Sequence, residues 1–210
     1  MRKIFFPTIG FIFLGSACGL IHSSQNYPNK GDFAIQRLSK KNFYKGQYPL
    51  SDEAVITYPP FIHQKSPNLC GLAAAQMVAG YYGRNLNRED FKSVESTAKK
   101  MGGASGQEMK NLFENSGFEV SVFSGTLGKG SRGIFSEIDR GRPLIVMLRK
   151  KAESHYMVLD GYDLKRELVI LNDPRDGPIA LSIKNFKMGW DLAGRFTLLA
   201  FPAESADIPQ

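Results

Sequence analysis

The chain has 210 residues and a formal net charge of +7; 42% of its residues are hydrophobic, 22% charged and 11% aromatic. These values exclude a wholly disordered chain, a collagen and a coiled coil. Two cysteines, Cys18 and Cys70, exclude a disulfide scaffold. Three histidines without a Cys-x-x-Cys pair argue against a metal site, and we expect no cofactor. The basic runs lack any recognition motif, so we expect no nucleic-acid partner.

Residues 1–17 have the pattern of an export signal. Arg2 and Lys3 give a positive start, residues 4–14 are almost wholly apolar, and small residues follow up to Cys18. This apolar run is shorter than the roughly 20 residues that span a bilayer. We therefore expect a cleaved signal, with a transmembrane anchor as the alternative, and hence an exported protein.

The end of this signal, Leu14-Gly15-Ser16-Ala17-Cys18, resembles the lipobox of bacterial lipoproteins. In those proteins the signal is cut before the cysteine, which then carries lipid. The leucine lies one position further from the cysteine than usual, and an ordinary signal cut nearby is the alternative. The resemblance implies lipidation at Cys18, membrane contact through that anchor and a cell-envelope location. The polar residues that follow, within 18–54, predict a tether.

Between residues 55 and 203 the pattern changes from helical to strand-like. An alanine-rich run is followed by a capping Asn87 and then by a Ser105/Glu108 capping box, and each helical run ends at glycine. Apolar residues then alternate with polar ones or form short continuous runs, as in strands. Helices followed by strands predict an α+β fold with an antiparallel sheet, ending in a loose tail at 204–210. The expected helices are 69–82, 87–101, 105–116 and 132–140, and the expected strands are 118–122, 144–148, 155–162, 167–173, 178–183 and 195–201.

Cys70 lies at the start of the alanine-rich helix. Asn68, after Pro67, is a plausible cap, which would place Cys70 in the first turn. A thiolate there is stabilised by the helix dipole and free amides, so its pKa falls. The alternative is a buried structural cysteine. Because Cys70 would be the only thiol in an exported protein whose Cys18 is lipidated or removed, we favour a reactive role.

Gln64 lies six residues before Cys70, and a loop of that length can fold its side chain back beside the helix start. Its amide NH₂ and the Cys70 N–H could then point at one oxyanion. The alternative is a solvated loop residue.

His155 begins one expected strand and Asp173 ends the next. A three-residue turn at 163–165 places His155 directly across from Asp173, with Cβ atoms roughly 5 Å apart. Asn172 is the competing partner, and only one of the two can face the imidazole because successive strand residues point to opposite faces. The alternative for His155 is a satisfied structural histidine.

Residues 64–83, QKSPNLCGLAAAQMVAGYYG, resemble the catalytic segment of C39-type cysteine peptidases. The later blocks 142–147, 155–162 and 169–174 resemble the same family, and the likeness covers about residues 58–202. These enzymes are papain-like and are known for removing leaders after a Gly-Gly pair. The resemblance therefore implies a papain-like fold over 55–203. It also implies that Cys70 is the nucleophile, His155 the general base and acid, Asp173 its orienting partner and Gln64 an oxyanion-hole residue.

The leading functional prediction is a cysteine peptidase acting on a peptide or protein substrate through an acyl-enzyme. An acyltransferase or amidase using the same cysteine, histidine and aspartate is the first alternative. The second is a surface-tethered binding module without catalysis, which the intact set of residues disfavours.

Overall fold

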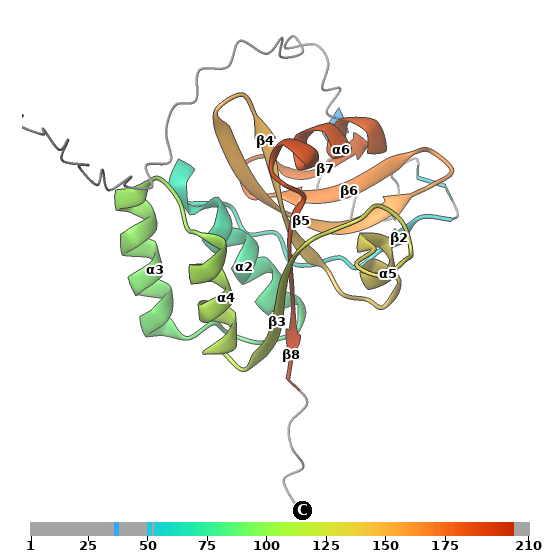
Figure 1. Cartoon of the computed structure of the whole chain (residues 1–210). Coiled ribbons are helices and arrows are strands. Elements are labelled where there is room, and N and C mark those ends of the chain that lie inside the picture. The colour runs from blue at the N-terminus through green and yellow to red at the C-terminus, as the bar shows by residue number, and fades with distance from the viewer. Residues whose placement is uncertain (1–35, 38–49, 52, 204–210) are drawn as a thin grey trace, which may run out of the picture.

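A computed structural model of the chain describes residues 36–37, 50–51 and 53–203 (Figure 1). The predicted signal at 1–17, Cys18, most of the predicted tether and the predicted tail at 204–210 lie outside the described residues. Three helices stand on one side of an antiparallel sheet, and shorter helices lie over its other parts (Figure 1). The predicted α+β class is confirmed.

The helical side forms where the sequence supplies helix caps. Asn87 accepts hydrogen bonds from the N–H groups of Glu89 and Asp90, and Ser105 and Glu108 form a complete capping box. These contacts satisfy amides that the first turn leaves without partners. These caps begin α3 (Arg88–Met101) and α4 (Gly106–Glu114), whereas the preceding 3₁₀ turn η1 (Pro67–Leu69) and helix α2 (Cys70–Tyr81) begin without a side-chain cap.

The described strands form one eight-stranded sheet in the order β1-β7-β6-β5-β4-β8-β3, and β2 pairs with β5 beside this path. Each of these strand pairings is antiparallel, as the sequence predicted. The strands are β1 (Gln36–Arg37), β2 (Val55–Ile56), β3 (Phe118–Ser124), β4 (Leu144–Lys150), β5 (Glu153–Asp163), β6 (Leu168–Asp173), β7 (Gly177–Ser182) and β8 (Phe196–Pro202). Two further helices are α5 (Ile134–Asp139) and α6 (Ile183–Leu192).

Besides the short strand β2, the helix α6 and the strand β1 differ from the sequence prediction. The helix α6 was not expected; Ser182 caps it by accepting a hydrogen bond from the N–H of Asn185, and Phe186 and Trp190, four residues apart, are buried. The strand β1 lies inside the segment predicted as a tether and pairs with β7. Its pairing uses backbone hydrogen bonds, which leave no mark on side-chain periodicity.

The sheet separates two hydrophobic cores. One lies against α2, α3 and α4 and includes Tyr156 and Val158 of β5; the other lies against α5 and α6 and includes Met157 and Leu159 of the same strand. Successive residues of β5 therefore face opposite cores, as the two-residue period of a strand requires. His155 belongs to the same face of β5 as Met157, on the side of α6.

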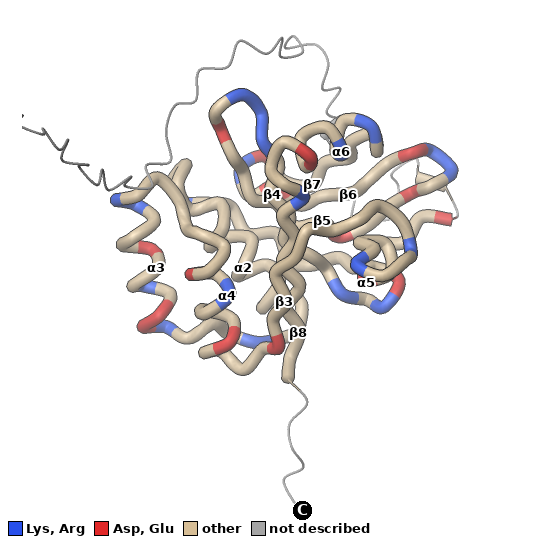
Figure 2. The backbone as a smooth tube through the Cα atoms, in the orientation of Figure 1, with Lys and Arg blue, Asp and Glu red and all other residues tan. Residues whose placement is uncertain are grey.

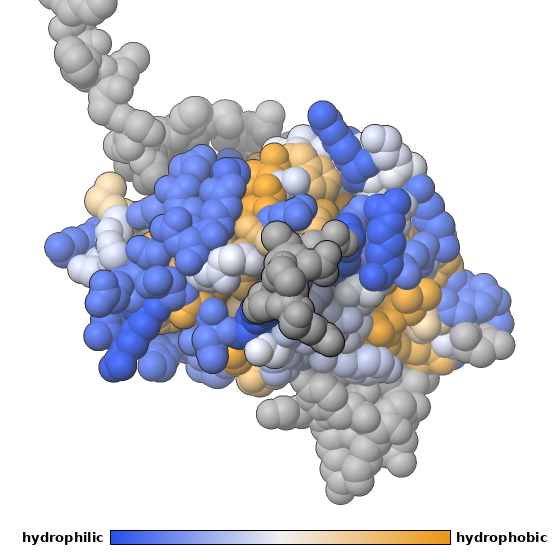
Figure 3. Space-filling view, turned by 90° about the horizontal axis from the view of Figure 1, so that it is seen from below, coloured by the Kyte–Doolittle hydropathy of each residue, from blue (hydrophilic) through white to orange (hydrophobic). Residues whose placement is uncertain are grey.

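Charged side chains of both signs are spread over the surface, with basic residues at the tip of the β4–β5 hairpin (Figure 2). Seen from below, the molecule shows apolar patches among mainly hydrophilic side chains (Figure 3). Among the described residues, no helix is both long enough and apolar enough to cross a membrane.

Candidate active site

Cys70 is the first residue of α2 and is 7% exposed. The predicted cap Asn68 is wrong: Asn68 lies inside the η1 turn, and Leu69 holds the N-cap position without a side-chain cap. The amides of the first turn of α2 are therefore not occupied by a capping side chain. Such amides and the positive end of the helix dipole favour a thiolate.

Gly71 lets α2 approach β5 closely. A Cβ atom at this position would lie 2.8 Å from the sulfur of Met109 and 3.1 Å from the ring of Tyr156. These contacts are tighter than ordinary van der Waals packing, so a side chain here would force Met109 of α4 and Tyr156 of β5 to shift. The glycine after the cysteine thus helps to bring Cys70 to the start of β5, where His155 lies.

His155 and Asp173 are in direct contact. Nε2 of His155 lies 2.7 Å from Oδ1 of Asp173, and the two side chains are only 11% and 7% exposed. A second hydrogen bond to the same carboxylate oxygen comes from the N–H of Arg175, at 2.8 Å. The carboxylate is thereby fixed against the imidazole ring.

The predicted hairpin register is wrong, although the predicted contact forms. The turn between β5 and β6 takes four residues, so Asp163 pairs with Leu168, and the register shifts again between Leu159 and Gly161. The last pair of this register is Val158 with Asn172. If the pairing is continued by one residue, Asp173 lies opposite Met157. His155 is then its diagonal neighbour on the same face, which a long side chain can reach.

Asn172 faces the opposite side of β6. Its Nδ2 donates a hydrogen bond to Oδ2 of Asp160 at 2.9 Å and a weaker one to the Pro59 carbonyl at 3.4 Å. Burial raises the pKa of Asp160 to about 8, so this carboxyl is mainly protonated at neutral pH. Of the two candidate partners, Asp173 is the one that contacts His155.

The second ring nitrogen of His155 is the one available to the thiol. Nδ1 is buried and makes no hydrogen bond, to Cys70 or to any other group, within the described part of the chain. Because Asp173 holds Nε2, an Nε2–H donor leaves Nδ1 free to accept the proton of Cys70. The neighbouring Tyr156 adds a backbone N–H to the sulfur. Sequence reasoning missed this donor, because strand periodicity says nothing about a free amide.

The electrostatics favour a charged pair. Burial alone raises the pKa of the Cys70 thiol, but the imidazole of His155 and the N–H groups of Tyr156 and Gly71 outweigh it and hold this pKa below its ordinary value. Burial alone lowers the pKa of His155, but Asp173 and Cys70 outweigh it and raise that pKa to about 9. Each partner therefore favours the charged form of the other, a thiolate beside an imidazolium.

Gln64 is buried at 5% exposure, so the alternative of a solvated loop residue is wrong. Its backbone N–H donates to the carbonyl of Pro174 at 2.9 Å, next to Asp173, and its Nε2 donates to the carbonyl of Ser66 at 2.8 Å. One N–H of the amide is thus used and the second remains for another acceptor. No hydrogen bond among the described residues joins the Gln64 side chain to Cys70, His155 or Asp173.

No group of three or more histidine, cysteine, aspartate or glutamate side chains in the described part of the chain is placed to hold a metal ion. The chemistry that these residues themselves support is nucleophilic attack by sulfur.

A model of the peptidase C39 family matches residues 59–204. The chain belongs to the peptidase C39 family. It is 26% identical over 147 residues to the lactococcin-G-processing and transport ATP-binding protein LagD of Lactococcus lactis subsp. lactis. That match covers 70% of this chain and 19% of the relative, so the chain spans about a fifth of the length of that protein.

Solved C39 structures share the fold. The peptidase domain of Streptococcus ComA, a bifunctional ABC transporter, superposes with a TM-score of 0.56 at 22% identity, over 70% of this chain and all of that domain. A C39-like peptidase from Bacillus anthracis gives a TM-score of 0.53 at 16% identity, over 72% of this chain and 99% of that one. The papain-like α+β fold is confirmed by these likenesses.

The lowered thiol pKa makes a prediction about reactivity. We expect iodoacetamide to alkylate Cys70 at rates that persist well below pH 8.5, roughly the pKa of a free thiol, because the thiolate survives at lower pH. The measurement is the alkylation rate against pH, with His155→Ala as the comparison, which should move the titration upward. A wild-type rate that follows ordinary thiol titration would identify Cys70 as structural.

Proposed function

We propose that this C39 family member is a cysteine peptidase with Cys70 as its nucleophile. The observation that carries the proposal is the 2.7 Å contact between Nε2 of His155 and Oδ1 of Asp173. That contact leaves the other ring nitrogen, Nδ1, available to Cys70, whose pKa is lowered. A cysteine activated by a histidine, which is in turn oriented by a third group, is the arrangement of a covalent acyl-transfer enzyme.

The proposed reaction runs in two halves. The Cys70 thiolate attacks the peptide carbonyl, and the oxygen that becomes negative is stabilised by the free N–H of Gln64 and by the amides that begin α2. The imidazolium of His155 then gives its Nδ1 proton to the leaving amine, which leaves a thioester on Cys70. A water molecule, deprotonated by His155, hydrolyses this thioester and restores the thiolate.

For the substrate, we propose a peptide or protein cleaved after a Gly-Gly pair. One structural neighbour, with a TM-score of 0.51 at 18% identity over 71% of this chain, is a double glycine motif protease in complex with a leader peptide. The match covers 95% of the chain of that neighbour. Family membership and that description support the substrate class.

Cleavage of a peptide library by the full chain, purified in detergent, tests this function. We expect cleavage after Gly-Gly by the wild type and none by Cys70→Ala, with Cys70→Ser as a near-isosteric second variant. Cleavage that survives in both variants would remove Cys70 from the reaction. Cleavage at other sequences that depends on Cys70 would support the peptidase function but contradict the Gly-Gly preference.

We also propose that the protein is an exported lipoprotein of the cell envelope, anchored through Cys18. The support is the sequence pattern of residues 1–18. Replacing Cys18 with alanine is expected to move the protein from the detergent phase to the aqueous phase in a phase-partition experiment, because stable membrane attachment requires the lipid. Cys70→Ala serves as the matched cysteine control. Unchanged partitioning of Cys18→Ala would refute the anchor.

A further inference from the structure

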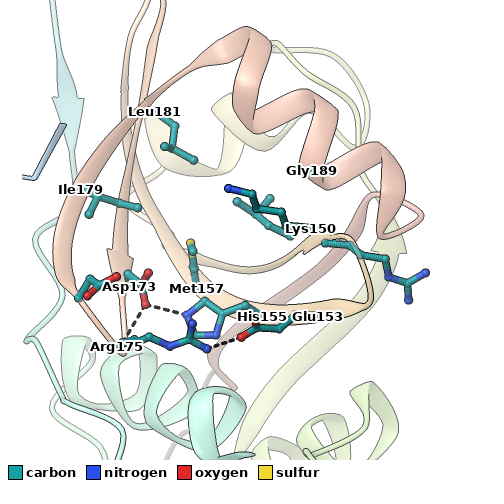
Figure 4. Close-up of a pocket in the computed structure, with 12 residues that line it drawn as sticks. Lys150, Glu153, His155, Met157, Asp173, Arg175, Ile179, Leu181 and Gly189 are labelled. Atoms are coloured by element: carbon teal, nitrogen blue, oxygen red, sulfur yellow. Dashed lines mark hydrogen bonds and ion pairs between the residues drawn. The ribbon is translucent and has the colours of Figure 1, made fainter. Parts of the chain in front are cut away.

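An apolar pocket adjoins the His155–Asp173 pair, between β4, β5, β7 and α6. Figure 4 shows His155 and Asp173 at one edge, with Ile179 and Leu181 of β7 projecting into it. Its volume is about 180 Å³. An engineered apolar cavity of about 150 Å³ holds a benzene molecule, so an aliphatic or phenyl side chain fits this one.

The walls and the mouth of the pocket differ in character. Leu148, directly across from His155 in the β4–β5 register, forms a wall together with Met157, Ile179 and Leu181. Gly189 of α6 also lines the pocket and adds no side chain to fill it. The mouth is charged, and Glu153 and Arg175 form an ion pair across 2.6 Å there. The other charged lining residues are Arg149, Lys150 and Asp176.

The position of the pocket decides which half of a substrate it can hold. It is lined by His155 and Asp173 but by neither Cys70 nor Gln64. The acyl half of the substrate is held at Cys70, where the thioester forms. The amine half must lie at His155, because that residue gives it a proton. The pocket lies beside His155 and away from Cys70, so of the two halves of the substrate the leaving-group half is the one it can receive.

We propose that this pocket receives an apolar side chain from the substrate segment that follows the scissile bond. The inference rests on the proposed peptidase function. It adds a preference for a residue after the scissile bond, whereas Gly-Gly recognition concerns the residues before that bond. A polar side chain would lose its water there against aliphatic walls, and a charged one would lose more. Leucine, isoleucine, methionine and phenylalanine are the expected occupants.

The acyl-enzyme can react either with water or with an added amine, and the partitioning between these two reactions tests the pocket separately from the first half-reaction. The p-nitrophenyl ester of an N-blocked Gly-Gly dipeptide acylates Cys70 with a leaving group that needs no side-chain pocket. Added amines then compete with water: the amine nitrogen attacks the thioester carbonyl, its proton passes to His155, and the Cys70 thiolate leaves. The measured quantity is the ratio of amide product to hydrolysis product. This ratio does not depend on how much of the enzyme is folded.

We expect leucinamide and phenylalaninamide to give amide product at least about tenfold more efficiently than glycinamide, and aspartic acid amide to be the poorest acceptor. Leu148→Asp should abolish the preference for apolar amines, because it places a charge on the pocket wall. The matched control is Leu164→Asp, since Leu164 is 47% exposed in the β5–β6 turn, and this variant should keep the preference.

The two ways of failing are distinct. Absence of Cys70-dependent p-nitrophenol release from the wild type would overturn the peptidase proposal and the pocket with it. Normal release followed by equal use of all amines, or a preference that Leu148→Asp leaves unchanged, would overturn the pocket alone.

Discussion

Asp173→Ala is expected to lower kcat/KM by up to about 10⁴-fold, the loss that removal of the orienting carboxylate causes in the serine triad. Asp173 accepts the Nε2–H of His155 and so fixes the tautomer whose Nδ1 meets the thiol. Without it the ring can rotate, and the imidazolium loses its countercharge. The measurement is kcat/KM against pH, normalised to alkylatable Cys70.

The pH profile should also change shape. Asp173 is one of the groups that raise the pKa of His155 to about 9, so wild-type acylation should decline as the pH rises through about 9 and the imidazolium loses its proton. In Asp173→Asn the negative charge is gone, so this decline should move to lower pH. A high-pH limb that stays in place would mean that the limb does not belong to His155.

Asn172→Ala is the matched control, one residue away on the same strand. Asn172 faces Asp160 on the other side of β6, so its loss should reduce stability more than turnover per folded molecule. The reverse order of effects on turnover, with Asn172→Ala the more damaging, would contradict the geometry of the site.

The helices were predictable because their boundaries are set by local side-chain contacts. Asn87 and the Ser105–Glu108 box act within three residues of the helix start, and the structure shows both. Asn68 failed as a cap because a 3₁₀ turn, which is frequent at helix termini, intervenes before α2. The signal for α6 was present in Ser182 and in the four-residue spacing of Phe186 and Trp190, but the run is short and follows a strand directly.

The pairing of His155 with Asp173 was predicted from a register that the structure does not have. A turn longer by one residue and an irregularity at Asp160 each shift the pairing, and neither leaves a distinctive sequence signal. The contact forms nevertheless because the net displacement is two residues: Asp173 lies level with Met157 and not with His155, so the two residues stay on one face and the imidazole spans a diagonal. A net displacement of one residue would have put them on opposite faces of the sheet.

Gln64→Glu is expected to lower kcat by about 10²–10³-fold, roughly 3–4 kcal/mol, with little change in substrate affinity. An oxyanion donor acts on charge that exists only in the transition state, so its removal affects turnover and not ground-state binding. The glutamate keeps the size of the side chain, removes the NH₂ donor and adds negative charge where the oxyanion must form. Gln64→Ala should therefore be no more damaging than Gln64→Glu.

The surroundings of Gln64 require a normalised measurement. Its Nε2 donates to the carbonyl of Ser66, and a buried carboxylate at this position would lose that bond and repel the carbonyl, which lowers stability as well as turnover. Titration of alkylatable Cys70 gives the folded fraction, and kcat per titrated site isolates the catalytic effect. Gln76→Glu is the matched control, because Gln76 lies exposed on α2 and undergoes the same change of charge. Near-normal kcat per site in Gln64→Glu would reduce Gln64 to a residue that only ties its loop to Pro174, and the oxyanion would then depend on the first amides of α2 alone.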